Sequence, residues 1–218
     1  MHLPTFFEIF YKNKEKTNLN KIKEVLENLG FTKNFKIINV VGTNGKGSVS
    51  NYLNQGFMQN DISVGLFTSP HLTKYNERIL GNGKMISDKD FITIAEKAKD
   101  ICIESKLNWF SMLYVIAMIH FSNSNVEYVI LEAGIGGEFD STNTIDGEYG
   151  VVTSISTDHL DFLKSRQHIP VDKSGIINRG MKFFMPSILE ESDKVPFRNK
   201  GAIELEIIKS TYQEENKS

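Results

Sequence analysis

The chain has 218 residues, a length that is enough for one large or two small domains. Its formal net charge of −2 at pH 7 gives no electrostatic reason to expect binding to nucleic acid or to an anionic membrane. The longest apolar run, near residues 114–121, is too short to cross a bilayer. A single cysteine, Cys102, excludes an internal disulfide and a multi-cysteine zinc site. The first residues lack the pattern of a signal peptide, so we expect a cytoplasmic protein.

Two helices are expected before the first strand. Residues 5–11 have the pattern of a short amphipathic helix with aromatic side chains, which suit either packing or the lining of a site for a flat ligand. Residues 20–29 carry apolar positions at helical spacing, and Gly30 is a natural C-cap.

A strand, a glycine-rich turn and a helix follow in immediate succession. Residues 37–41 are apolar and β-branched, as in a central parallel strand, and a helix is expected to begin at Ser48. Glycines let backbone N–H groups approach a bulky ligand, a helix start favours anions, and Lys46 adds a positive charge. The pattern is typical of a phosphate-binding P-loop with tighter spacing than usual; the alternative is a βα turn without a ligand. The predicted phosphate-binding residues are Gly42, Thr43, Asn44, Gly45, Lys46, Gly47 and Ser48.

The next strand is expected over residues 62–67, and it ends in Thr-Ser-Pro-His. Proline cannot continue a central strand, so the chain leaves the sheet at its carboxyl end, where open α/β sheets bind ligands. Ser69 and His71 are therefore predicted to face the phosphates, the alternative for His71 being a solvated loop residue.

A hairpin turn at residues 81–84 and two helices come next. Ser87 is a plausible N-cap for a helix that runs to about Glu104, and residues 110–121 have the pattern of a more buried helix. Residues 126–132 then predict a buried strand closed by Glu132. A carboxylate in this place is the Walker-B arrangement, facing the magnesium ion of a P-loop, and the alternative is a solvated strand end.

The last part of the chain adds another candidate for the same site. A strand over residues 149–155 leads to Asp158 and His159, which suit a metal or phosphate shell. A helix begun by proline is expected over 169–177, with strand candidates at 181–185 and 202–208. Strands alternating with helices indicate the α/β class, with a mostly parallel sheet flanked by helices.

Several motifs together carry a resemblance to one family. They are Gly-Thr-Asn-Gly-Lys-Gly-Ser at 42–48, Thr-Ser-Pro-His-Leu at 68–72, Asn-Glu-Arg at 76–78, Leu-Glu-Ala-Gly-Ile-Gly-Gly at 131–137, Asp-Ser-Thr-Asn at 140–143, Thr-Ser-Ile at 153–155 with Asp158 and His159, and Asp-Lys-Ser-Gly-Ile-Ile at 172–177. Over roughly residues 18–186 the chain resembles folylpolyglutamate synthase/dihydrofolate synthase, a Mur-ligase-like enzyme. The resemblance implies a P-loop NTPase-like Mur ligase central domain over 1–208, a polar tail at 209–218, and absence of the family's carboxyl-terminal domain.

The resemblance also implies a function: an ATP- and Mg²⁺-dependent ligase that adds glutamate to dihydropteroate or folate through an acyl phosphate. The alternative is a catalytically incomplete ATP-binding remnant, or a subunit whose missing domain comes from a separate polypeptide. The implied catalytic residues are Lys46, His159 and Lys173, the last matching a lysine that the family carries as a carbamate. Implied metal ligands are Ser48, Ser69, Glu132 and His159, and implied substrate residues are His71, Asp140, Ser141 and Thr142.

The chain departs from the family pattern on the side that is associated with the pterin. Ser111 stands where family members have a glutamate, and a Leu-Gly-Leu-x-Arg pattern is weakened to Thr-Asn-Leu-Asn-Lys at 17–21. The resemblance therefore supports phosphate handling more strongly than pterin recognition.

Overall fold

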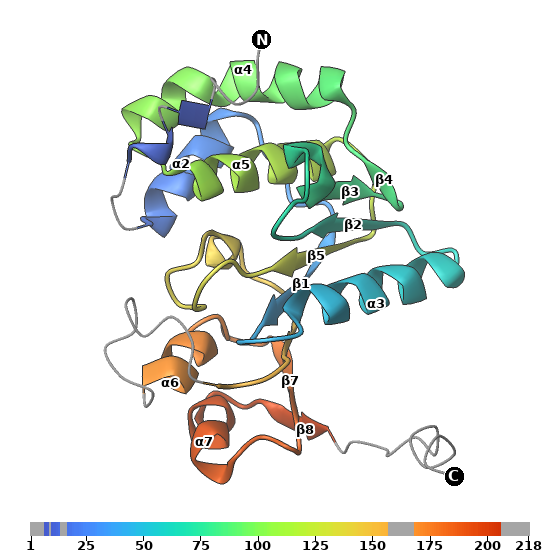
Figure 1. Cartoon of the computed structure of the whole chain (residues 1–218), viewed down its shortest axis with the longest axis vertical. Helices are drawn as coiled ribbons and strands as arrows, with labels where there is room; N and C mark the ends of the chain where they lie inside the picture. The colour runs from blue at the N-terminus through green and yellow to red at the C-terminus, as the bar shows by residue number, and fades with distance from the viewer. Residues whose placement is uncertain (1–6, 9, 14–16, 157–167, 206–218) are drawn as a thin grey trace.

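The computed structural model describes residues 7–8, 10–13, 17–156 and 168–205 (Figure 1). Of the predicted features, Asp158, His159 and the tail at 209–218 lie outside the described residues. Within the predicted helix at 5–11, the described residues 7, 8, 10 and 11 include Phe7 and Phe10, both fully or nearly fully buried in the core.

An eight-stranded sheet forms the centre of the molecule, in the order β4-β3-β2-β5-β1-β6-β7-β8. The strands are β1 (Lys36–Val41), β2 (Val64–Phe67), β3 (Ile79–Gly81), β4 (Lys84–Met85), β5 (Tyr128–Glu132), β6 (Tyr149–Val152), β7 (Lys182–Pro186) and β8 (Ile203–Leu205). Six strands, from β2 to β8 in the spatial order, pair in parallel, and β3 pairs antiparallel with both β2 and β4. The predicted mostly parallel sheet is confirmed. The β3–β4 hairpin turns through Asn82 and Gly83, both at positive φ, as its sequence predicts.

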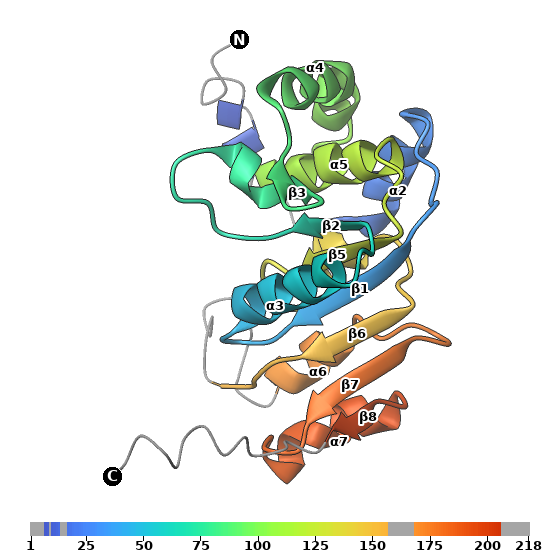
Figure 2. The same cartoon turned by 90° about the vertical axis from the view of Figure 1, so that its right-hand side faces the viewer.

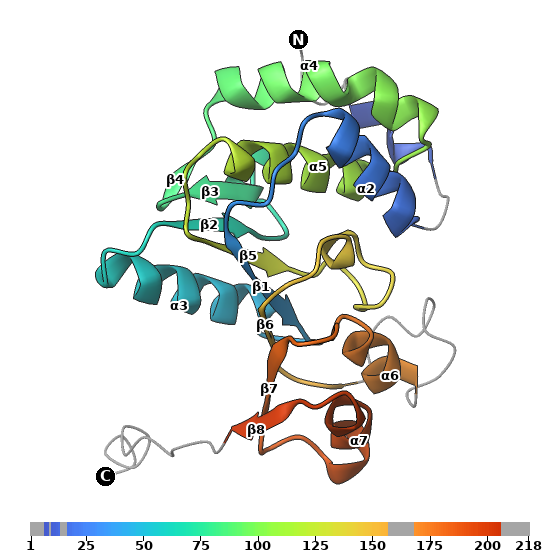
Figure 3. The same ribbon diagram turned by 180° about the vertical axis from the view of Figure 1, so that it is seen from behind.

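Helices cover the sheet from both sides (Figures 2 and 3). They are α2 (Leu19–Asn28), α3 (Lys46–Gln59), α4 (Asp88–Glu104), α5 (Trp109–Ser122), α6 (His168–Ser174) and α7 (Glu191–Asn199), with 3₁₀ turns η1 (Tyr75–Arg78) and η2 (Ser141–Asn143). Helix α3 packs on one face, over alternate residues of β1, β2 and β5. The opposite face is covered by α2, α4 and α5 at one end and by α6 and α7 at the other.

Helix α5 is apolar on nearly all sides because it is buried on nearly all sides. This helix lies between the sheet and the pair α2 and α4, and most of its residues are buried. The neighbouring α4 is amphipathic and begins at the predicted N-cap, Ser87, whose hydroxyl accepts from the N–H of Asp90. Its buried face includes Cys102, which is 0% exposed, and burial raises the pKa of this thiol to about 12.

Several elements differ from the sequence predictions. The strands expected at 62–67 and 126–132 begin at Val64 and Tyr128, and the helix expected at 169–177 is His168–Ser174. Helix α3 begins at Lys46 rather than Ser48, because Gly45 at φ +82° is its N-cap. Strand β6 ends at Val152 rather than at 155: Thr153 N still donates to Val41 O at the end of β1, but Ser154 O already accepts from the N–H of Thr43 in the P-loop. Helix α7 was not predicted at all, and it contains Pro196.

Candidate functional site

The predicted P-loop connects β1 to α3 at the carboxyl edge of the sheet. Gly42 has φ +150°, and a Cβ at this position would overlap Thr153 Oγ1 and lie 3.1 Å from the backbone nitrogen of Ser154. Gly45 also has positive φ, which a residue with a side chain adopts at a cost. The loop therefore takes a backbone path that its glycines make possible, and it ends at the amino terminus of α3, where a helix favours anions.

Residues after β6 hold the loop from the other side. The N–H of Thr43 donates to Ser154 O at 2.8 Å, and the Thr43 hydroxyl donates to Ser156 O at 3.2 Å while accepting from Ser156 N at 3.0 Å. The N–H of Asn44 donates to Ser154 Oγ at 2.9 Å. These bonds fix the shape of the loop independently of any ligand.

We expect Thr43→Val, which keeps the side-chain shape but removes the hydroxyl, to destabilise the fold by about 1–2 kcal/mol, since a buried N–H and C=O lose their partner. This corresponds to a fall in Tm of roughly 2–8 °C for a chain of this size, measurable by calorimetry. Thr43→Ser keeps the hydroxyl and should retain most of the stability. Equal Tm values for Thr43→Val and the wild type would contradict a clamping role for this hydroxyl.

Two lysines meet on one oxygen of the loop. Lys46 Nζ donates to Gly42 O at 3.1 Å and to Thr43 O at 3.2 Å. Lys173, which is 4% exposed and reaches in from α6, donates to Gly42 O at 2.9 Å. The structure thus brings together two predicted residues that are far apart in the sequence. Two ammonium groups on one carbonyl make a concentrated positive centre at the start of α3, which suits a polyphosphate.

Glu132 lies beside the first turn of α3, at the end of β5. Its carboxylate is 3% exposed and accepts from the Thr68 hydroxyl and from the N–H of Ser69, the latter at 2.9 Å. A Cβ on Gly47 would lie 3.5 Å from Glu132 Oε1, so this carboxylate closely faces the helix start. Among the described residues it has no cationic partner, and a buried carboxylate without one suits a cation.

The residues around Glu132 fit a magnesium ion by their chemistry. Ser48 is exposed in the first turn of α3, and Ser69 sits next to the carboxylate, so the donors are oxygens, which Mg²⁺ prefers. Within the described part of the chain no three His, Cys, Asp or Glu side chains cluster. The fourth predicted ligand, His159, is outside the described residues.

Asp140 organises the glycine-rich loop after β5. Its buried carboxylate accepts from Gly134 N at 2.9 Å, Ile135 N at 3.1 Å, Thr142 N at 2.9 Å and the Thr142 hydroxyl at 2.6 Å. Burial raises the pKa of this carboxyl, and the four hydrogen bonds oppose that shift. Ser141 is also buried, and its hydroxyl lies 2.9 Å from that of Ser111. Direct substrate contact by Asp140, Ser141 and Thr142 stays a prediction, whereas their role in holding the loop is visible in these bonds.

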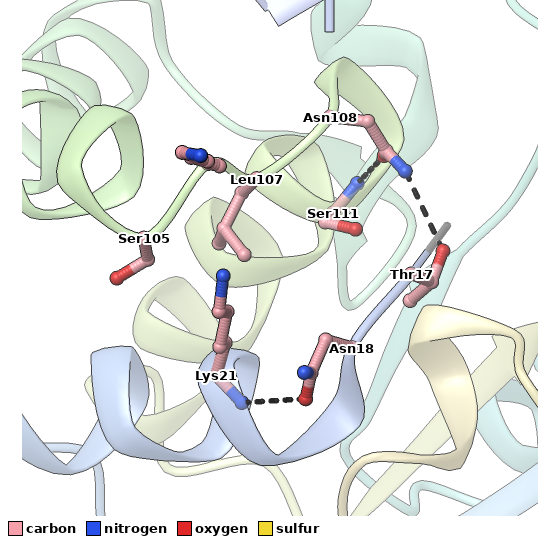
Figure 4. Close-up of a pocket in the computed structure, with 8 residues that line it drawn as sticks. Thr17, Asn18, Lys21, Ser105, Leu107, Asn108 and Ser111 are labelled. Atoms are coloured by element: carbon pink, nitrogen blue, oxygen red, sulfur yellow. Dashed lines mark hydrogen bonds between the residues drawn. The ribbon is translucent and has the colours of Figure 1, made fainter. Parts of the chain in front are cut away.

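The two departures from the family pattern meet in one place (Figure 4). A pocket of about 230 Å³ lies between the start of α2 and the turn before α5. It is lined by Thr17, Asn18, Lys21, Ser105, Lys106, Leu107, Asn108 and Ser111. Ser111 and the segment 17–21, which are separated by some ninety residues, therefore belong to one polar pocket, whose described lining contains lysines and no acidic side chain.

His71 lies in the loop after β2, where its Nδ1 accepts from Arg78 Nε at 2.8 Å. Its ring packs on Tyr75, with 4.6 Å between centroids. Burial first, and then the charge of Arg78, lower the pKa of His71, while Glu77 opposes them. The side chain is thus oriented within its own loop, and its predicted contact with phosphate stays a prediction.

Sequence reasoning missed two parts of this site. The clamp by residues 154–156 joins segments more than a hundred residues apart, and no local pattern signals it. Arg78 belongs to the Asn-Glu-Arg motif of the resemblance but was given no role; a basic residue closing a loop at the carboxyl edge of the sheet was the available signal.

Together, a glycine-rich loop at a helix start, a lysine on it and a carboxylate at the end of the neighbouring strand define a P-loop NTPase-like domain. The sequence profile of the Mur ligase middle domain matches residues 40–217. The chain belongs to the Mur ligase family, as its motifs predict.

Within the Mur ligase family, the chain is similar to enzymes of one kind. The chain is 36% identical over 177 residues to the dihydrofolate synthase/folylpolyglutamate synthase of Buchnera aphidicola subsp. Schizaphis graminum, covering 78% of this chain and 41% of that protein. It is 34% identical over 175 residues to the enzyme of the same name from Bacillus subtilis (strain 168), covering 76% of this chain and 41% of that protein.

A solved structure agrees with this narrower resemblance. A bifunctional folylpolyglutamate synthase/dihydrofolate synthase with Mn, AMPPNP and L-glutamate bound matches with a TM-score of 0.83 at 28% identity, over 94% of this chain and 51% of that one. The chain therefore spans about half the length, or less, of the relatives it matches.

Proposed function

We propose that the chain binds ATP with Mg²⁺ and supplies the phosphoryl-transfer centre of a ligase that joins glutamate to dihydropteroate or a folate. The observation that carries this proposal is the convergence of Lys46 and Lys173 on Gly42 O, beside the Glu132 carboxylate. The relative solved with Mn, AMPPNP and L-glutamate supports the choice of nucleotide, divalent ion and amino acid. The names of the curated relatives support the acid substrate.

Different residues would bind the phosphates and the magnesium ion. The N–H groups at the start of α3 and the Lys46 and Lys173 ammonium groups would bind and orient the phosphates, and would stabilise charge on them during transfer. Ser48, Ser69 and Glu132 would hold a magnesium ion, which supplies charge neutralisation when bound. We keep the role of His159 as a second metal ligand as a further part of the proposal. A carbamate on Lys173, which the resemblance implies, is the alternative to the ammonium form: it would replace the positive charge by an anion that orders magnesium, and Lys46 alone would then supply the ammonium group for the phosphates.

The proposed reaction has two transfers. A carboxylate oxygen of the acid attacks the γ-phosphorus of ATP, and the bond to the β,γ-bridging oxygen breaks, releasing ADP and leaving an acyl phosphate. The amine of glutamate then attacks the acyl carbon, phosphate leaves, and the amine loses a proton. Both steps depend on positioning and on stabilised negative charge, which is what a P-loop provides.

A second candidate is a binding module without turnover by itself. The alignment with the Buchnera enzyme covers 41% of that protein, and this candidate concerns the matched part alone. We propose that a separate polypeptide can supply the remaining half, including glutamate binding and the carboxyl-terminal domain. An apolar groove of about 330 Å³ beside α3, lined by Ile38, Val49, Leu53, Phe57, Tyr128, Tyr149, Gly150, Val151 and Phe184, supports this, since parallel sheets are normally covered on both faces.

The described helices include none that is long and apolar enough to cross a membrane. We propose the cytoplasm as the site of action, because the substrates of the proposed reaction are small soluble molecules. Neither a nucleic acid nor a membrane is part of the proposed function.

A turnover assay separates the two candidates. The chain is incubated with ATP, Mg²⁺, labelled glutamate and either dihydropteroate or tetrahydrofolate, while ADP and labelled product are measured. We expect release of one ADP for each glutamate incorporated. AMPPNP binding without product would favour the binding module, and adding the unmatched half of the Bacillus subtilis relative should then restore turnover. Absence of AMPPNP binding would overturn both candidates.

A further inference from the structure

Arg78 carries a buried charge that the described protein does not neutralise. The residue is 5% exposed, and it forms no ion pair among the described residues. Its Nε donates to His71 Nδ1 at 2.8 Å, and its Cζ lies 5.0 Å from the centre of the Trp109 ring. No hydrogen bond to either terminal nitrogen, Nη1 or Nη2, is present within the described chain.

An arrangement of this kind is costly without a ligand. Arginine stays protonated in proteins, and buried charges are normally paired. A neutral histidine and an aromatic face orient the guanidinium, but neither supplies a negative charge to pair with it. A buried cation in a candidate site, oriented and lacking a counter-ion, indicates a place for an anion.

The loop that carries Arg78 is organised in advance of any ligand. The Glu77 carboxylate accepts from the Thr73 hydroxyl at 2.6 Å and from the N–H groups of Leu72 at 2.7 Å, Lys74 at 2.7 Å and Thr73 at 2.9 Å. The hydroxyl bond first, and then the backbone bonds, lower the pKa of Glu77 to about 2. The Arg78 carbonyl accepts from Thr68 N at 3.0 Å, which anchors the other end of the loop to β2. The guanidinium is therefore held in a defined position.

The wall behind the guanidinium is aromatic and also fixed. Trp109 stacks on Tyr11, with 5.2 Å between ring centroids. The Tyr11 hydroxyl lies 3.1 Å from that of Tyr75, which packs on His71. Arg78 thus sits against a set of rings that join the amino-terminal segment, η1 and α5.

Arg78 also lies on the phosphate side of the molecule. Thr68, whose N–H bonds to the Arg78 carbonyl, uses its hydroxyl to hold Glu132. Glu132 is close enough for its charge to act on the guanidinium. A ligand bound by the free fork of Arg78 would therefore reach toward the carboxylate that faces the P-loop.

We propose that Arg78 binds the reacting carboxylate of the acid substrate through its terminal nitrogens and presents it to the phosphate centre. The planar fork of arginine matches a carboxylate bidentately, which lysine does not. The inference rests on the proposed function, because it assigns one residue to the acid in that reaction. His71 and Trp109 act in this inference as positioning residues, since both contact the Arg78 guanidinium and orient it.

The test compares dihydropteroate with its carboxamide counterpart, which lacks the charge. By calorimetry, wild type should bind the carboxylate roughly 10–100-fold more tightly than the amide, as expected for a charge-assisted bidentate contact. Arg78→Gln should remove most of this preference, and Arg78→Lys should restore part of it. Arg179→Gln, at an exposed arginine, is the matched control and should keep the full preference.

A thermal measurement separates a ligand-binding role from a structural one. Replacing an unpaired buried charge by an apolar side chain is often neutral or stabilising, so Arg78→Met should have a Tm equal to or above that of the wild type. A clear fall in the Tm of Arg78→Met would assign a structural role to Arg78 and overturn the proposal. An unchanged carboxylate preference in Arg78→Gln, or no binding of dihydropteroate by the wild type, would also overturn it.

The affinity for AMPPNP is measured separately from the preference for the carboxylate. AMPPNP affinity should stay within about twofold in Arg78→Gln, because Lys46 and Lys173 hold the phosphates. If the wild type does not bind AMPPNP, the proposed function itself is wrong. If AMPPNP binds while the carboxylate preference survives Arg78→Gln, only the assignment of Arg78 is wrong.

Discussion

Replacing Lys46 by alanine should weaken the binding of magnesium-ATP by about 100-fold or more. Lys46 Nζ already sits within 3.2 Å of two carbonyl oxygens of the loop, so its ammonium group is in place at the start of α3. Removal leaves Lys173 as the only described lysine on Gly42 O. Isothermal calorimetry with AMPPNP and Mg²⁺ measures the change.

Lys89→Ala is the matched control for this experiment. Lys89 is an exposed lysine in the first turn of α4, a helix packed on α5 and not on the loop. It should bind AMPPNP like the wild type. Chelating the divalent ion should weaken binding in the wild type, since Glu132 would then face the phosphates without a cation between them. Equal affinity in Lys46→Ala and the wild type would remove the basis for the proposed nucleotide site.

Asp140→Ala should be the most damaging of the stability variants. The substitution leaves the N–H groups of Gly134, Ile135 and Thr142 without their acceptor, and that of Thr142 is buried. We expect a loss of about 3 kcal/mol or more, which corresponds to a fall in Tm of roughly 6–12 °C. Thermal unfolding followed by circular dichroism measures it.

The control for Asp140 is another aspartate in the same region. Asp146 is exposed, and no hydrogen bond to its side chain is present in the described chain. Asp146→Ala should change the stability by no more than about 0.5 kcal/mol. If Asp140→Ala and Asp146→Ala had the same Tm, the loop after β5 would not depend on the buried carboxylate.

The central strands could be predicted from the sequence because they are buried on both faces. Residues 128–131 are a continuous apolar run, and residues 37–41 are apolar except for Asn39; a buried strand is the simplest local structure that explains such runs. Helix α7 shows the opposite case. Pro196 argues against a helix locally, but Phe197 stacks on Phe183 of β7 at 5.8 Å between centroids, and this tertiary contact is absent from any local pattern.

Some residues of the candidate site could likewise be predicted from the sequence, and others could not. Lys46 and Glu132 could be predicted because a strand end or helix start fixes their position, whereas Lys173 was found only through the resemblance. The bonds of Thr43 to Ser156 and of Arg78 to His71 depend on how separate segments meet. The position of a site residue can be predicted from the sequence where one helix or strand fixes it. It cannot be predicted where several separate elements must come together.

Because the chain has one cysteine and it is buried, a fluorescent label can be attached in the loop at 71–78 alone. Because the Cys102 thiol is enclosed and remains protonated at neutral pH, maleimide reagents should leave it unmodified in the folded protein. Leu72 is 93% exposed in that loop. A cysteine introduced there would therefore carry one fluorescent label without background, and its emission could follow occupancy of the neighbouring site in real time.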